Sequence, residues 1–159
     1  MDTGWLTPEP PALKPMARIV VEVGALVTLG MGPHGERRYV PLGDGTVSGP
    51  ELQGRVVAGG VDWQVQRADG ATDIAAHYVI RTPDDALVEV QSQGLRHGPP
   101  EVMARLARGE TVAPEAYYFR TVMRFCTGHA TWAHLNRVIA LAVGQREAQR
   151  VLLDVWRLG

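Results

Sequence analysis

Acidic, basic and aromatic side chains recur on short segments that alternate polar with apolar residues, and they form a set suited to acid–base chemistry. A carboxyl group in a partly dry cavity has a raised pKa and serves as a general acid or base. A nearby arginine stabilises a carboxylate or enolate oxygen, and tyrosine or neutral histidine can pass it a proton. The candidate catalytic residues are Asp62, Asp73, His77, Tyr118 and Arg120.

Further polar and aromatic side chains on these segments are candidates for contacts with a substrate. Asp62 and Trp63 are adjacent, so on a strand they face opposite sides unless a bulge intervenes; Trp63 is interpreted either as a core anchor or as a ligand contact. Arg96 precedes a predicted helix, where it belongs either to a pocket rim or to a solvated turn. The candidate substrate-binding residues are Trp63, Gln64, Arg96, Arg124, Trp132, His134 and Asn136.

The sequence lacks the patterns of most nucleophilic and cofactor-dependent enzymes. Lys14 is its sole lysine, so neither a Schiff base nor a phosphate-binding loop is expected, and no G-x-S-x-G motif occurs. Residues 30–35 match G-x-G-x-x-G, but no helix or βαβ unit follows. The five histidines show no metal-ligand spacing, and Cys126 is typical of an inert thiol. We therefore expect neither a metal nor another cofactor.

Length and composition indicate one soluble domain. The chain has 159 residues, a formal net charge of −1 and a single cysteine, so a basic nucleic-acid surface and an internal disulfide are not expected. No apolar run is long enough to span a bilayer, and no secretory signal is visible. These features predict a cytoplasmic protein with a small organic ligand or substrate as its partner, no nucleic acid and no membrane. A homo-oligomer, with a dimer favoured, is also expected.

The elements that must position the candidate residues are mostly strands. Residues 1–15 are rich in proline and predict a flexible arm, which leaves residues 16–159 as the domain. Asp69 and Gly70 between two alternating runs predict a hairpin with a two-residue type I′ turn. The predicted strand segments are 17–29, 55–58, 61–68, 72–81, 86–93, 117–126, 135–143 and 150–158.

One segment predicts a helix rather than a strand. Residues 99–109 begin with two prolines, carry an early acid and late arginines, and end at a glycine, which is the usual order of helix signals. One short helix among about eight strands, without βαβ alternation, indicates an all-β antiparallel sandwich or barrel. The barrel is favoured because closure removes exposed strand edges.

Several strings resemble one known family along nearly the whole chain after the arm. They are GPHGERRYVPLGDGTVSGPELQGRVVAGGVDWQ (32–64), RTPDDALVEV (81–90), LRHGPPEVMARLARGE (95–110), EAYYFRTVMRF (115–125) and HLNRV (134–138). The chain resembles the domain-of-unknown-function family 3237. That resemblance implies a calycin-like antiparallel β-barrel of the allene-oxide-cyclase kind, with a lumen that could hold a small organic molecule.

Three positions depart from the pattern of that family. Cys126 stands where the family usually has an acidic residue, and His134 stands where an aromatic residue is usual. Residues 75–77 replace an Asp-x-Arg, and Asp73 on the same strand face is the candidate substitute. If the acidic residues of the family take part in chemistry, this chain is expected either to perform that chemistry differently or to do something else, and both a specialised and a degenerate pocket fit the departures.

Two functions remain open from the sequence. The first is a cofactor-independent isomerase, cyclase or lyase that uses acid–base chemistry in the barrel lumen, in natural-product or secondary metabolism. The second is a non-catalytic barrel that binds a small hydrophobic ligand through the same residues.

Overall fold

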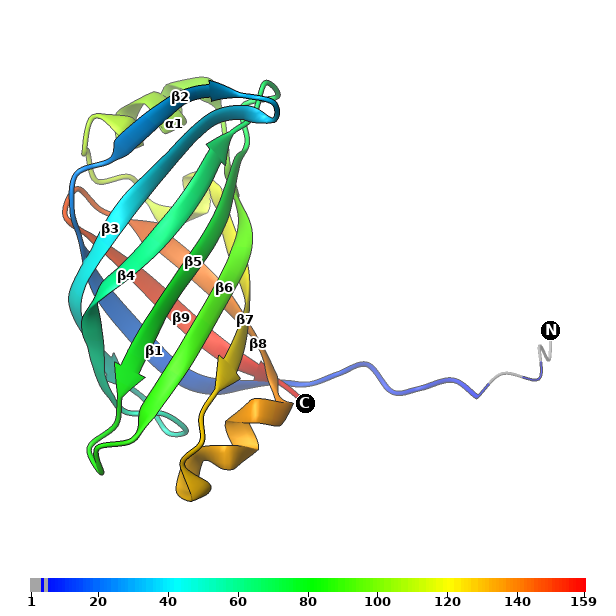
Figure 1. The fold of residues 1–159 in the computed structure, drawn as a ribbon. Helices are drawn as coiled ribbons and strands as arrows, with labels where there is room; N and C mark the ends of the chain where they lie inside the picture. The colour runs from blue at the N-terminus through cyan, green and yellow to red at the C-terminus, as the bar shows by residue number, and fades with distance from the viewer. Residues whose placement is uncertain (1–3, 5) are drawn as a thin grey trace.

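The structure, a computed structural model, describes residue 4 and residues 6–159, and in this part of the chain nine strands form one antiparallel sheet (Figure 1). The strands are β1 (Leu13–Val23), β2 (Val27–Gly32), β3 (Gly35–Ser48), β4 (Gly54–Gln66), β5 (Thr72–Arg81), β6 (Leu87–His97), β7 (Tyr118–Cys126), β8 (Ile139–Arg146) and β9 (Arg150–Leu158). The helical segments are α1 (Pro100–Ala107), η1 (Pro114–Ala116) and η2 (Ala130–Arg137).

The sheet closes on itself into a barrel. Its order is β1-β9-β8-β7-β6-β5-β4-β3-β2. An additional pairing of β1 with β3 closes the ring and leaves β2 outside it. The prediction of an antiparallel barrel is therefore confirmed. β2 pairs with β3 beyond the closed ring, and β2 and α1 lie at one end of the barrel while η2 lies at the other (Figure 1). None of the helices in the described residues is long and apolar enough to cross a membrane.

Apolar side chains fill the barrel interior towards the η2 end. Alternate residues of each strand point inward, and η2 adds the buried Leu135. We call this group the apolar plug, and each of its side chains is at most 1% exposed: Met16, Ile19, Leu52, Val56, Ile80, Val88, Val90, Met123 and Leu135. The plug is continuous with the rest of the hydrophobic core, so it provides the burial that stabilises the fold.

The predicted helix is confirmed as α1, which starts after Pro99 and carries Glu101 in its first turn and Arg105 in its last. The predicted hairpin at Asp69 and Gly70 is also confirmed, but the turn type was wrong. Gly70 adopts a positive φ of 90° and Asp69 does not, and the backbone bond from Arg67 N to Ala71 O encloses one residue more than a two-residue turn. The pairing of β4 with β5 is therefore shifted by one residue.

Several predicted strands differ from the observed ones. The predicted strand 17–29 is divided between β1 and β2, and the predicted strands 55–58 and 61–68 form the single strand β4. β3 was missed altogether, because its glycines and Pro41 resemble turn punctuation, yet it is a 14-residue strand. Residues 135–137 belong to the 3-10 segment η2 rather than to a strand, and β8 begins only at Ile139. β1 begins at Leu13, so the last three residues assigned to the arm pair with β9.

Candidate functional site

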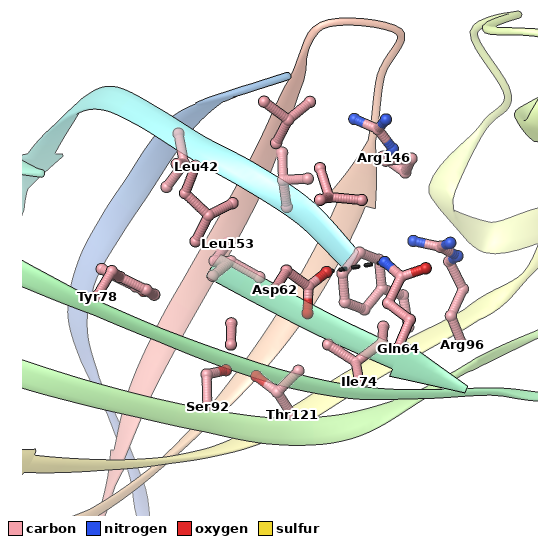
Figure 2. A pocket seen from close by; sticks show the side chains of 16 residues that line it. Leu42, Asp62, Gln64, Ile74, Tyr78, Ser92, Arg96, Thr121, Arg146 and Leu153 are labelled. Atoms are coloured by element: carbon pink, nitrogen blue, oxygen red, sulfur yellow. Dashed lines mark hydrogen bonds between the residues drawn. The ribbon is translucent and has the colours of Figure 1, made fainter. Parts of the chain in front are cut away.

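The barrel encloses a cavity beside the apolar plug, on the side nearer α1 (Figure 2). Its volume is about 40 Å³, room for roughly three water molecules or a short organic group. Each strand of the closed ring contributes to the wall, in the part of the chain that the structure describes. The lining residues are Val21, Val23, Val40, Leu42, Asp62, Gln64, Ile74, Ala76, Tyr78, Ser92, Arg96, Phe119, Thr121, Arg146, Val151 and Leu153.

Asp62 on β4 is the carboxylate in this wall, and its orientation is fixed by a chain of hydrogen bonds. Gln64 Nε2 donates to Asp62 Oδ2 at 2.8 Å (Figure 2), and Arg38 Nε donates to Gln64 Oε1 at 3.1 Å. The guanidinium thus fixes which way the Gln64 amide points, and the amide holds one carboxylate oxygen. The other oxygen, Oδ1, is buried without a partner among the described residues.

The surroundings of Asp62 act on its pKa in opposite directions. Burial raises the pKa of the carboxyl above its ordinary value, and this is the largest effect. The hydrogen bond from Gln64 and the positive charges of Arg96, Arg146 and Arg38 lower it, but by less. The net result is a carboxyl group with a raised pKa, as general acid–base catalysis requires.

Buried polar atoms without hydrogen-bond partners are concentrated in this cavity. Within the described residues there are four such side-chain atoms: Asp62 Oδ1, Tyr78 OH, Arg96 Nε and Thr121 Oγ1. All four residues line the cavity. Buried polar groups are normally paired, because an unpaired one costs about 1–3 kcal/mol. A cluster of unpaired donors and acceptors around one space is what a site for a polar ligand requires.

Two arginines face Asp62 from the α1 side of the cavity (Figure 2). The Arg96 side chain is buried, and its guanidinium lies over the ring of Phe119, 5.5 Å from the ring centroid. That ring in turn covers Gly144, where a Cβ would lie 2.7 Å from the ring carbons. Arg146 is anchored through its backbone, since its N–H donates to Tyr117 OH at 2.8 Å.

Of the residues predicted from sequence, Asp62, Gln64 and Arg96 lie together in the cavity wall. Asp73 and His77 do not, because on β5 the residues facing the lumen are Ile74, Ala76 and Tyr78. The Asp73 side chain is 48% exposed and pairs with Arg67, and the His77 side chain is 56% exposed and pairs with Glu89. The expectation that these two share the cavity with Asp62 was therefore wrong.

Tyr118, Arg120 and Arg124 also lie on the outer wall, because the inward positions of β7 are Phe119, Thr121, Met123 and Phe125. Tyr118 stacks on His97 with ring centroids 4.9 Å apart, and the Arg120 guanidinium lies 5.0 Å from the Tyr118 ring centroid. Tyr118 and Arg120 line an external groove of about 530 Å³ rather than the barrel interior.

The predicted aromatic contacts are likewise outside the cavity. Trp63 packs on the outer wall against Tyr39, with ring centroids 5.0 Å apart, so it is not an interior anchor. Trp132 and His134 line a groove at the η2 end of the barrel. Asn136 has a structural role there: it accepts from Thr127 N at 2.8 Å and donates to Thr127 O at 2.9 Å.

Among the polar residues of the site that were missed from sequence are Arg38, Tyr78, Thr121 and Arg146. Arg38 lies on β3, which was not recognised as a strand. Tyr78 and Arg146 do follow a visible signal, because each continues an alternating run of small or apolar residues on one strand: Ile74, Ala76 and Tyr78, and Ala140, Ala142, Gly144 and Arg146. A polar group that occupies a position in an inward-facing series of a strand points into the lumen.

No three His, Cys, Asp or Glu side chains of the described residues lie close enough to hold a metal ion. Cys126 is exposed on the outer wall.

Comparison with known proteins gives consistent matches over nearly the whole chain. The model of the family described as "Protein of unknown function (DUF3237)" matches residues 11–158. A UPF0311 protein of Bradyrhizobium diazoefficiens is 41% identical over 137 residues, which cover 86% of this chain and 90% of the relative. The crystal structure of a conserved protein of unknown function from Rhodopseudomonas palustris aligns with a TM-score of 0.91 and 35% identity, over 96% of this chain and all of the other.

A more distant structure is described as an enzyme from Penicillium herquei. It aligns with a TM-score of 0.73 over 98% of this chain and 99% of the other. The two sequences are 21% identical, so this likeness concerns the fold alone. An enzyme therefore occurs on the same barrel architecture.

Proposed function

Since the chain belongs to the DUF3237 family, whose description assigns no activity, we propose its function from the interior site: a cofactor-independent isomerase, cyclase or lyase that moves a proton with Asp62. One observation carries the proposal. The buried Oδ1 of Asp62 has no partner among the described residues and lies in the wall of a cavity that could admit a short organic group. A free carboxylate oxygen in such a place is suited to take or give a proton.

The reaction needs no redox partner. Ionised Asp62 takes a proton from a carbon next to a substrate carbonyl, the electron pair of that C–H bond forms a C=C bond, and the carbonyl π pair moves onto oxygen. The resulting enolate oxygen accepts hydrogen bonds from a guanidinium, Arg96 or Arg146, or from the hydroxyl of Thr121. Where the enolate is conjugated with a further C=C bond, return of the proton from Asp62 to the far carbon of that system restores the carbonyl and completes an isomerisation. Attack by the enolate carbon on a second carbonyl carbon of the same molecule would instead close a ring: the π pair of that carbonyl moves onto its oxygen, which takes the proton from Asp62.

The raised pKa of Asp62 suits this role. A carboxylate that holds its proton more tightly than an exposed aspartate is a stronger base, and its conjugate acid remains available to return the proton. Burial also raises the pKa of Tyr78, with a smaller contribution from the charge of Asp62, so the phenol stays a neutral donor beside the carboxyl.

The second candidate is a binding barrel without turnover, and one observation favours it. Among the described residues, Asp62 is the one carboxylate lining the cavity, and the predicted proton-transfer partners Asp73, His77 and Tyr118 lie elsewhere. A binder needs only the complementary hydrogen bonds that the unpaired atoms offer. A place in secondary metabolism and a homodimer both stay predictions.

Proton exchange tests the first candidate without knowledge of the natural substrate. We would incubate the protein in D₂O with small β-keto acids, 1,3-diketones and hydroxyaromatic ketones, and follow the loss of enolisable C–H signals by NMR. At least one compound is expected to exchange faster with the wild-type protein than in buffer. Asp62→Asn should lower that rate by about 10²–10⁴-fold while the compound still binds.

Asp73→Asn is the matched control, because it makes the same chemical change on the outer wall of the neighbouring strand. It is expected to leave the exchange rate unchanged. Equal rates for Asp62→Asn and the wild type would refute the role of Asp62. Compounds that bind to the wild type without any accelerated exchange would favour the binding barrel.

A further inference from the structure

Arg96 is a buried cation without a counter-ion. Its side chain is 9% exposed, and no described residue offers it a hydrogen bond or an ion pair. Its contact with Phe119 is a cation–π interaction at 5.5 Å, which compensates only part of the loss of hydration. Buried guanidinium groups are normally held by carboxylates or carbonyl oxygens, so the position of Arg96 calls for an acceptor that none of the described residues provides.

The cavity as a whole has more positive than negative groups. Arg96 and Arg146 line it, and Arg38 stands behind Gln64, whereas Asp62 is the opposing carboxylate in the described wall. Burial lowers the pKa of Arg96 to about 10, so this guanidinium is still charged at neutral pH. No ion pair joins Asp62 to any of the three arginines in residues 4 and 6–159. The site therefore favours a ligand that brings negative charge.

We infer that the ligand of the interior site is a small organic anion, a carboxylate or enolate, whose charged oxygen binds to the guanidinium groups of Arg96 and Arg146. This names the substrate class of the site proposed above and depends on that proposal for the chemistry, but not for binding. The remainder of the ligand lies against Asp62, with the unpaired hydroxyls of Thr121 and Tyr78 as donors for a second oxygen. The cavity of about 40 Å³ limits this ligand to a few heavy atoms beyond the charged group.

A matched pair of probes separates charge from shape. Acetoacetate and its methyl ester share the enolisable carbon and the ketone, and only the first carries a negative charge. By calorimetry we expect the wild-type protein to bind acetoacetate at least about tenfold more tightly than the ester, because charge-assisted hydrogen bonds are stronger than neutral ones. Equal affinities would overturn the inference.

Variants then locate the charged oxygen. Arg96→Met and Arg146→Met should each weaken acetoacetate binding at least about tenfold and leave ester binding unchanged. Arg120→Met, on the outer wall, is the control and should bind both probes as the wild type does. In the absence of any probe, Arg96→Met should also melt at a higher temperature than the wild type, since it removes an unpaired buried charge. An arginine with a purely structural role would instead lower that temperature.

Inorganic anions can also bind to guanidinium groups, so chloride and phosphate are tested as competitors of acetoacetate in a separate experiment. If either displaces acetoacetate at equal concentration, the site takes an inorganic ion and the organic assignment fails. Asp62→Asn separates this inference from the proposed function. If it keeps both acetoacetate binding and proton exchange, the catalytic role of Asp62 fails and the anion site stands. If the arginine variants bind acetoacetate normally while Asp62→Asn loses proton exchange, the anion site fails and the catalytic role of Asp62 stands.

Discussion

The two halves of the barrel interior differ in the polarity of the side chains that fill them. Towards η2, the apolar plug leaves no polar atom to satisfy, and its side chains are at most 1% exposed. Towards α1, the same strands turn Asp62, Gln64, Arg96 and Arg146 inward and leave several of their atoms without partners. The change takes place within single strands: on β5, Ile80 belongs to the plug and Tyr78, two residues before it, lines the cavity.

This difference separates stability from function along the barrel axis. A buried unpaired group lowers stability, so a protein tolerates a cluster of them only where the rest of the fold compensates and the site has a use. The plug provides that compensation through apolar burial. Substitutions in the plug should therefore lower stability and spare binding. Substitutions of unpaired polar groups in the cavity should not lower stability and should change binding or proton transfer.

The largest effect on stability is expected from Ile80→Ala. The side chain is fully buried, so its truncation should lower the free energy of unfolding by about 2–5 kcal/mol through lost burial and a residual cavity. Chemical denaturation measures this, and acetoacetate affinity should stay within about twofold of the wild type. Leu87→Ala on β6 is the control, because Leu87 is half exposed, and it should cost less than about 0.5 kcal/mol. A marked loss of affinity in Ile80→Ala would show that the two halves are coupled.

An intermediate effect is expected from Asp62→Asn, and it should depend on pH. Burial raises the pKa of Asp62 in the folded protein above the unfolded value of 3.8, so the folded state binds more protons in that window. Stability therefore falls as pH rises from about 4 through the folded-state pKa. The asparagine variant escapes this loss and should melt a few degrees, about 2–4 °C per kcal/mol, above the wild type at neutral pH.

The melting temperatures of the wild type and of Asp62→Asn should converge at about pH 3, where Asp62 is protonated in both the folded and the unfolded chain. Differential scanning calorimetry across this range provides the measurement. The positive charges of Arg96, Arg146 and Arg38 oppose the shift and set its size. A variant that melts below the wild type at neutral pH would mean that ionised Asp62 stabilises the fold.

The smallest effect is expected from Tyr78→Phe, at the boundary between the halves. The hydroxyl of Tyr78 has no partner among the described residues, so its removal should leave stability unchanged or raise it by about 1 kcal/mol. Tyr117→Phe is the matched control, because that hydroxyl accepts a hydrogen bond from Arg146 N and its loss should cost about 1 kcal/mol. The same loss from both variants in urea denaturation would mean that Tyr78 has a partner, and the boundary would then lie closer to α1.

The sequence was sufficient for the barrel, the helix and the family, but not for which strand faces point inward, and the turn at Asp69 and Gly70 is one reason. A two-residue turn at Asp69 and Gly70 would pair Asp62 with His77. The observed turn is one residue longer and pairs Asp62 with Ala76 instead. A shift of one residue moves every side chain of a strand to its other face. With the predicted two-residue turn, Asp73 and His77 would share the face of Asp62; with the observed turn they lie on the opposite face.

The arginines show a second limit of sequence reasoning. Alternation correctly separated the two faces of β4, β5 and β7, but it does not say which face points inward when both carry polar residues. Arg146 follows an alternating series of alanine and glycine on β8, which indicates that it points inward. Arg38 lies in a segment whose glycines were interpreted as turns. The pairing of β3 with β4 places Arg38 directly opposite Gln64, so sequence reasoning that missed β3 as a strand did not find this contact.

The stack of Gly144, Phe119 and Arg96 has a consequence for sorting the relatives of this chain. Any side chain at position 144 would displace the ring, and the ring supports the guanidinium. A homologue with a larger residue there must give up either the aromatic group or the placement of its cation. That single alignment column should thus divide the family into members that retain an anion clamp and members that recognise uncharged guests.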